Sequence, residues 1–183
     1  PLKLAGALQA YYWKPIQSGV APEGDKETVS RLSGLPADRI LPESYRLTMP
    51  LSPHRSAELD GVTIEPATMV PPAVDGPLVI EGAGGLMVPL TRAFLQIDLY
   101  ATWNLPVILV TRTTLGTINH TLLSIAAFRS RQIPLHGVAF VGEDHARVEQ
   151  HRVALLVARV LREDAAIELE RGRVAHYRQR GGT

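Results

Sequence analysis

Three short apolar runs dominate the pattern of this chain: residues 78–80, 107–110 and 138–141. They are rich in residues that favour strands and do not alternate with polar ones, which is typical of strands buried on both faces of a sheet. Between the last two runs, residues 117–131 carry apolar side chains at helical spacing, and Thr117 is a good candidate for the N-cap of that helix. The runs follow one another at about thirty residues, the length of a strand–helix–strand unit.

Weaker signals extend this pattern toward the N-terminus. Residues 2–8 are interpreted as the end of a helix, 11–13 as a strand, and 28–35 as a short helix that ends at a glycine. The Pro-rich stretch 65–76 is expected to be a surface connection. Together the elements predict a single α/β domain over residues 1–183, with a mainly parallel sheet and flanking helices.

Composition and charge narrow the classes of function. Of the 183 residues, 45% are apolar and 20% charged, and the net charge is +1, so neither nucleic acid nor a membrane is an expected partner. No apolar run reaches the roughly 18–20 residues of a membrane span. The sequence contains no cysteine, which excludes a disulfide scaffold, cysteine-ligated zinc and a thiol nucleophile, and fits a cytoplasmic location.

Ligands of parallel α/β sheets bind at the carboxyl ends of the strands, and two such ends carry candidate chemistry. After 78–80 comes Glu81-Gly82-Ala83-Gly84-Gly85, in which a carboxylate suits Mg²⁺ and the glycines let the backbone approach an anion. The alternative is a glycine turn with a solvated glutamate. After 11–13 comes Lys14, which can stabilise developing negative charge or simply be an exposed lysine.

Three further segments each allow a functional and a purely structural interpretation. The helix that begins near Thr117 presents N–H groups suited to a carboxylate or phosphate, although a plain N-cap explains it equally well. Asp25, in a polar loop before a helix, can cap that helix or bind a metal. The basic segment 171–183 is interpreted as a poorly ordered tail, either a solvated terminus or a site for an anion or a partner.

Taken together, these segments resemble the dethiobiotin synthetase family. The resemblance covers roughly residues 1–142, and its motifs match in order and separation. Besides the Asp25 loop, they are residues 12–19 (YWKPIQSG), 45–54 (YRLTMPLSPH), 79–90 (VIEGAGGLMVPL), 106–110 (PVILV) and 115–120 (LGTINH).

The resemblance implies a P-loop NTPase-like fold and a homodimeric enzyme that uses ATP and Mg²⁺. Its reaction joins CO₂ to 7,8-diaminopelargonate and closes the ring of dethiobiotin through a carbamate and a carbamic-phosphoric anhydride. The implied roles are catalysis for Lys14, Mg²⁺ and nucleotide binding for Asp25 and Glu81, nucleotide binding for Gly82, Ala83 and Gly84, and substrate binding for Ser18, Gly116, Thr117 and Asn119.

Two departures from the family pattern keep other hypotheses open. The chain contains no G-x-x-x-x-G-K-[ST] motif, so the first strand and the P-loop are expected upstream of Pro1. Val141 stands at or beside the place where the family usually carries an asparagine that contacts adenine. The alternatives are a non-catalytic, dimeric P-loop-like module and another ATPase of the same superfamily.

Overall fold

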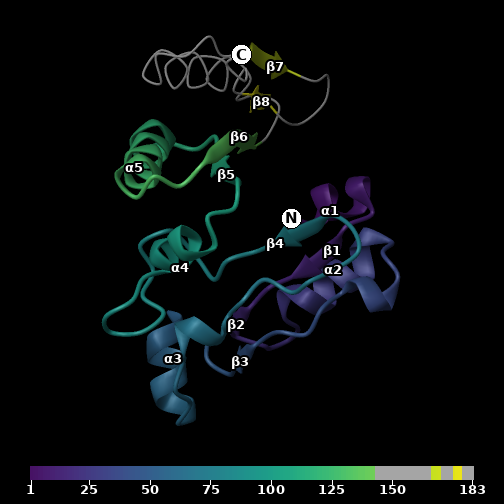
Figure 1. Ribbon diagram of the computed structural model, residues 1–183, viewed down its shortest axis with the longest axis vertical. Coiled ribbons are helices and arrows are strands. Elements are labelled where there is room, and N and C mark those ends of the chain that lie inside the picture. Colours follow the sequence, from purple (N-terminus) through teal and green to yellow (C-terminus); the bar gives the residue numbers. More distant parts are fainter. Residues whose placement is uncertain (143–165, 170–174, 179–183) are drawn as a thin grey trace. The chain divides into compact units, whose positions relative to one another are not determined.

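The computed structural model describes residues 1–142, 166–169 and 175–178 (Figure 1). The chain divides into two compact units, Pro1–Trp103 and Asn104–Thr183, and each is described by itself. Both contain parallel strand pairs and helices, which confirms the predicted α/β class. The single domain predicted for residues 1–183 stays a prediction.

The first unit holds two pairs of parallel strands. Strand β1 (Tyr11–Trp13) pairs with β4 (Leu78–Ile80), and β2 (Ile16–Ser18) pairs with β3 (Tyr45–Leu47). In the first pair Trp13 lies opposite Ile80. The residues that come next, Lys14 and Glu81, therefore emerge beside each other at the carboxyl ends of neighbouring strands.

Four α-helices and two 3₁₀ turns accompany these strands. They are α1 (Leu2–Leu8), α2 (Asp25–Ser33), α3 (Pro53–Asp60), α4 (Gln96–Trp103), η1 (Ala37–Arg39) and η2 (Pro66–Thr68). Helix α3 begins at a proline, whose fixed φ suits a first helical turn. Helix α2 ends before Gly34, whose φ of 71° lies in the left-handed region that favours glycine.

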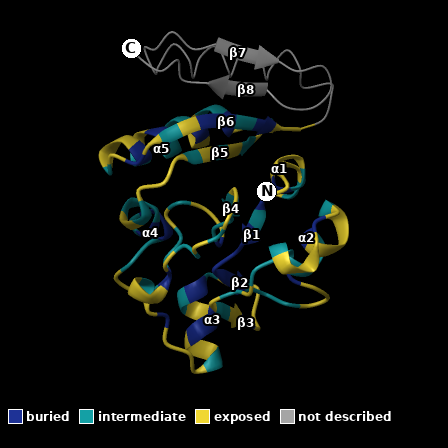
Figure 2. Cartoon of the chain, turned by 45° about the vertical axis from the view of Figure 1, so that its right-hand side comes forward, coloured by how far each residue is buried: buried dark blue, intermediate teal, exposed yellow. Residues whose placement is uncertain are grey.

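The core of the first unit packs around β1 and β2. Figure 2 shows buried residues in these two strands and in α3, whereas α2 is mostly of intermediate burial or exposed. The core cluster includes Trp13, Ile16 and Leu47, and Trp103 packs against it. The Trp13 and Trp103 rings lie 5.8 Å apart between centroids and are tilted by 42°, so the two tryptophans are packing residues.

The second unit contains one sheet with strand order β5-β6-β8-β7. Its elements are β5 (Val107–Arg112), α5 (Thr117–Ser130), β6 (Leu135–Val141), β7 (Ala166–Leu169) and β8 (Ala175–Arg178). Strands β5 and β6 are parallel, whereas β8 runs antiparallel to both of its neighbours. Among the described residues, no helix is both long enough and apolar enough to span a membrane.

The strands expected at 11–13, 78–80, 107–110 and 138–141 are all present as β1, β4, β5 and β6. The sequence pattern did not predict β2 or β3, because each is three residues long and has a polar residue, Gln17 or Arg46, at its centre.

The expectation that the strands at 78–80, 107–110 and 138–141 are buried on both faces is wrong for β5, and the three residues of β4 are only partly buried. Ile108 and Val110 are 40% and 57% exposed. Helix α5 covers the opposite face, where the Thr111 hydroxyl lies 2.9 Å from those of Thr117 and Thr121.

Two helix starts also differ from the prediction. Helix α2 begins at Asp25, three residues early, because the Glu27 carboxylate accepts the Gly24 N–H at 2.9 Å and stabilises the first turn. Helix α5 has Gly116 as its N-cap (φ 92°), and Thr117 is its first residue. The Thr117 hydroxyl donates to the Arg112 carbonyl instead of capping the helix. Most of the tail predicted at 171–183 lies outside the described residues.

Candidate functional site

The first unit brings three predicted site residues together around one ammonium group. Lys14 Nζ contacts Asp25 Oδ2 and lies 3.4 Å from Glu81 Oε1. Lys14 follows β1, Glu81 follows β4, and Asp25 opens α2. Lys14 is only 6% exposed, so the alternative of an ordinary exposed lysine is wrong. A buried ammonium needs anionic partners, and here two carboxylates from distant segments provide them.

Asp25 is placed by a side chain that the sequence analysis missed. Its backbone N–H donates to Gln17 Oε1 at 3.0 Å, and Gln17 is buried in β2. Gly24 is the N-cap of α2, and the Asp25 carboxylate turns toward Lys14. The capping role considered for Asp25 is therefore wrong. The strand position of Gln17, eight residues before Asp25, gives no local signal of this contact.

Glu81 is held by two neighbours on β1. Its backbone N–H donates to the Trp13 carbonyl at 2.9 Å, which continues the β1–β4 pairing by one residue. The Tyr12 hydroxyl donates to Glu81 Oε2 at 2.6 Å. Burial, followed by the negative charge of Glu81, raises the pKa of Tyr12 far above its usual range, so this hydroxyl keeps its proton. Tyr12 was not predicted as a contact of the site.

The glycine-rich loop after β4 packs closely against α4. The Ala83 N–H donates to Gln96 Oε1 at 3.1 Å. A Cβ at Gly82 would lie 1.9 Å from the Tyr100 hydroxyl oxygen and 3.2 Å from the side-chain amide carbon of Gln96, so any larger residue would force the Tyr100 side chain to shift. Burial, with the nearby charge of Glu81, raises the pKa of Tyr100 to about 12. The loop is therefore a packed element with a defined conformation.

Two buried polar atoms at these elements have no hydrogen-bond partner within the described part of the chain. They are the Ser18 hydroxyl at the end of β2 and Nε2 of Gln96, a residue that is 1% exposed. Buried polar groups are rarely left unpaired. Ser18 is one of the predicted substrate contacts, and its hydroxyl is available for one. Gln96 was not predicted, because its position at the start of α4 resembles an ordinary core position.

The donor set around Lys14 fits a divalent cation that also binds a nucleotide. The described residues contain no cluster of three or more His, Asp or Glu side chains suited to holding a metal. The carboxylates of Asp25 and Glu81 nevertheless share one ion-pair partner, the ammonium group of Lys14. Mg²⁺ typically uses one or two protein carboxylates, and phosphates and water complete its coordination. Asp25 and Glu81 are the residues that would hold it.

The remaining predicted site residues belong to the second unit, at the start of α5. Gly116 and Asn119 are exposed, and Thr117 is buried. The Thr117 N–H donates to the Thr114 carbonyl at 3.1 Å, so the N–H groups that the first turn leaves without an intrahelical partner are those of Ile118 and Asn119. Val141 ends β6 and is 51% exposed.

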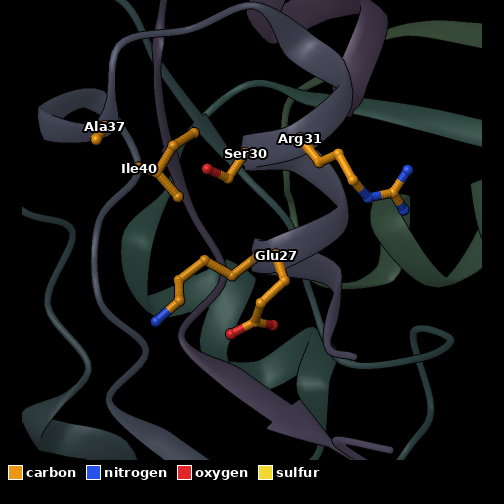
Figure 3. Close-up of a pocket in the computed structure, with 6 residues that line it drawn as sticks. Glu27, Ser30, Arg31, Ala37 and Ile40 are labelled. Carbon is orange, nitrogen blue, oxygen red and sulfur yellow. The ribbon is translucent and has the colours of Figure 1, made fainter. Parts of the chain in front are cut away.

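A pocket of about 380 Å³ on the first unit has none of the three cluster residues in its lining (Figure 3). Its lining comes from α2 and the η1 segment: Lys26, Glu27, Ser30, Arg31, Ala37 and Ile40. The charged side chains among these are already paired, Lys26 with Glu43, Glu27 with Arg46 and Arg31 with Glu23. Convergent charge marks the Lys14 cluster as the candidate site, because chemistry requires groups aimed at one point.

Comparison with known proteins agrees with this geometry. A family model described as an AAA domain matches residues 2–170, and with the parallel α/β arrangement it defines the chain as P-loop NTPase-like. ATP-dependent dethiobiotin synthetase BioD of Rhodopseudomonas palustris is 60% identical over 159 residues, which are 87% of this chain and 74% of the relative.

The enzyme of the same name from Nitrobacter hamburgensis is 56% identical over 159 residues, 87% of this chain and 74% of the relative. That of Agrobacterium fabrum is 58% identical over 147 residues, 80% and 69% of the two chains. The chain belongs to the dethiobiotin synthetase family of enzymes, which confirms the resemblance found in its motifs.

Proposed function

We propose that this protein forms dethiobiotin from 7,8-diaminopelargonate, CO₂ and ATP, with Mg²⁺ on the nucleotide. Family membership supports the overall reaction. The observation that carries the assignment of residues is the shared ammonium of Lys14, in contact with Asp25 and 3.4 Å from Glu81 at the carboxyl ends of neighbouring strands. This arrangement suits a reaction in which anionic groups must be gathered and neutralised.

The proposed chemistry proceeds in three balanced steps. One amine of the substrate attacks CO₂ and loses a proton, which gives a carbamate. A carbamate oxygen then attacks the γ-phosphorus of ATP, the bond to ADP breaks, and a carbamic-phosphoric anhydride forms. The second amine attacks the carbonyl carbon and loses a proton while phosphate leaves, which closes the cyclic urea. Phosphoryl transfer of this kind depends mainly on alignment and charge neutralisation.

The residues of the first unit divide these tasks. Lys14 stabilises the carbamate and the transferring phosphoryl group, and Asp25 and Glu81 hold Mg²⁺, which when bound neutralises phosphate charge. Gly82, Ala83 and Gly84 form the backbone that faces the nucleotide. Since the Ala83 N–H already donates to Gln96, we expect the N–H groups of the two glycines to make the contacts. Ser18 contacts the substrate, and its buried hydroxyl, unpaired among the described residues, supports this role.

In this proposal the second unit binds the carboxylate of the substrate. Gly116, Thr117 and Asn119 form the start of α5, which offers the positive end of the helix dipole and the N–H of Asn119, since the Thr117 N–H already donates to Thr114. We propose that the enzyme acts as a homodimer in the cytoplasm, with substrate near the boundary between subunits.

The test is dethiobiotin formation by the complete natural protein from diaminopelargonate, bicarbonate and Mg-ATP. We expect turnover that requires all three, and Glu81→Gln should raise the Mg²⁺ concentration that gives half-maximal rate. ATP hydrolysis without dependence on diaminopelargonate would favour another ATPase of the superfamily, and a protein without turnover would favour a non-catalytic module. An unchanged Mg²⁺ requirement in Glu81→Gln would remove Glu81 from the metal site.

A further inference from the structure

One buried contact at the site is not used by the proposed mechanism: the hydrogen bond between Tyr12 and Glu81. The two residues are far apart in sequence, and the Tyr12 hydroxyl donates to Glu81 Oε2 at 2.6 Å. Tyr12 is 0% exposed. Lys14 Nζ lies at the other oxygen of the same carboxylate, 3.4 Å from Oε1. The two oxygens of Glu81 are thus assigned to different partners.

The backbone of β1 fixes the direction from which these partners approach. Tyr12 pairs with Val79 of β4 on one side and forms a parallel bridge with Ile40 on the other. Side chains alternate along a strand, so Tyr12 and Lys14 project from one face of β1 and Trp13 from the opposite face. Because the strand is paired on both sides at Tyr12 and the ring is buried, the backbone and the ring together fix the position of the hydroxyl group.

We propose that Tyr12 is a positioning residue, which holds Glu81 by Oε2 and so presents Oε1 to Lys14 and to the divalent cation. This inference rests on the proposed metal-binding role of Glu81. Carboxylates that ligate a metal are commonly hydrogen-bonded through their second oxygen, and loss of such a partner typically lowers metal affinity or activity about 10–100-fold. Tyr12 provides that hydrogen bond here, and Glu81 serves as a one-oxygen ligand.

The hydroxyl is suited to this task because it remains a donor. A phenol O–H can donate to a carboxylate oxygen, and the buried ring places this one 2.6 Å from Glu81 Oε2. Phenylalanine at this position keeps the buried ring and removes one oxygen atom. The Glu81 side chain, which is 25% exposed, would then be free to turn both oxygens toward Lys14 or water.

The experiment measures Mn²⁺ binding to the complete natural protein in the presence of ADP, from the electron paramagnetic resonance signal of unbound Mn²⁺. Four proteins are compared: wild type, Tyr12→Phe, Glu81→Gln and Tyr11→Phe. The last is a matched control, because the Tyr11 hydroxyl donates to the exposed Asp75 at the same distance, 2.6 Å. Steady-state assays add the half-saturating Mg²⁺ concentration and the KM for diaminopelargonate.

We expect the Mn²⁺ dissociation constant of Tyr12→Phe to rise about 10–100-fold, with Tyr11→Phe at the wild-type value and the KM for diaminopelargonate unchanged. A general loss of folded protein would lower the number of binding sites and leave the dissociation constant of the remaining sites unaltered. Weak Mn²⁺ binding in Glu81→Gln together with wild-type Mn²⁺ affinity in Tyr12→Phe would overturn the positioning role of Tyr12 and leave the metal role of Glu81 intact. Wild-type affinity in Glu81→Gln would overturn the metal role of Glu81 itself.

Discussion

Replacing Lys14 with methionine tests the cluster most directly. Lys14 is 6% exposed, and methionine keeps an unbranched, flexible stem in that space while removing the charge. If the ammonium stabilises the transferring phosphoryl group, kcat should fall at least about 10²-fold, as it does when one preorganised electrostatic group is lost. This corresponds to about 2.7 kcal/mol of transition-state stabilisation.

Whereas Lys14→Met should lower kcat, it should strengthen the binding of Mg²⁺. At the 3.4 Å between Nζ and Glu81 Oε1, the attraction is about 5 kcal/mol at an effective dielectric constant of 20 and about 1 kcal/mol in bulk water. The Glu81 side chain is 25% exposed, so the true value lies between these limits. Without this competitor, the Asp25 and Glu81 carboxylates should bind Mg²⁺ more tightly, and the half-saturating concentration should fall several-fold.

The assay is steady-state dethiobiotin formation as a function of Mg²⁺ at saturating ATP. Lys26→Met is the matched control, since the Lys26 ammonium forms its ion pair with Glu43, at 2.7 Å, and not with a cluster residue. The kcat of this variant should stay within about twofold of wild type, because an ion pair outside the site does not act on the transition state. A wild-type kcat in Lys14→Met would remove Lys14 from catalysis. An Mg²⁺ requirement that rises, as expected for Glu81→Gln, would refute the competition between lysine and metal.

Two further predictions concern stability, measured by urea unfolding. Gly82→Ala should destabilise the fold by about 1–3 kcal/mol through overpacking, because the new Cβ would lie 1.9 Å from the Tyr100 hydroxyl oxygen. Adding Tyr100→Phe to Gly82→Ala should recover part of this loss, and the free-energy changes of the two substitutions would be additive only if the overpacking argument were wrong. Gly85→Ala is the control and should be close to neutral, because a Cβ there meets open space. Burial, then the charge of Glu81, raises the pKa of Tyr12 in the folded state, so its stabilising effect is complete below its unfolded pKa near 10 and decreases above it by up to about 1.4 kcal/mol per pH unit. Tyr12→Phe should therefore lose stability less steeply between pH 10 and 11 than wild type, and equal slopes would show that Tyr12 ionises normally.

The elements that carry the chemistry were predictable from the amino-acid pattern. The apolar runs at 11–13 and 78–80 predicted two strands, and these are β1 and β4. Because neighbouring parallel strands end at the same edge of a sheet, it was predictable that Lys14 and Glu81 lie at the same edge. The ordered motifs also identified the family.

The contacts that build this edge of the sheet became visible only in the three-dimensional fold. Tyr12 has the pattern of a core strand residue, yet its hydroxyl reaches Glu81, 69 positions away; its alternation with Lys14 was the one signal of a shared face. Gln17 and Gln96 likewise place Asp25 and the glycine loop through side-chain contacts between separate elements. Local sequence records the conformational preference of a segment, whereas the pairing of buried polar atoms depends on which segments meet when the chain packs.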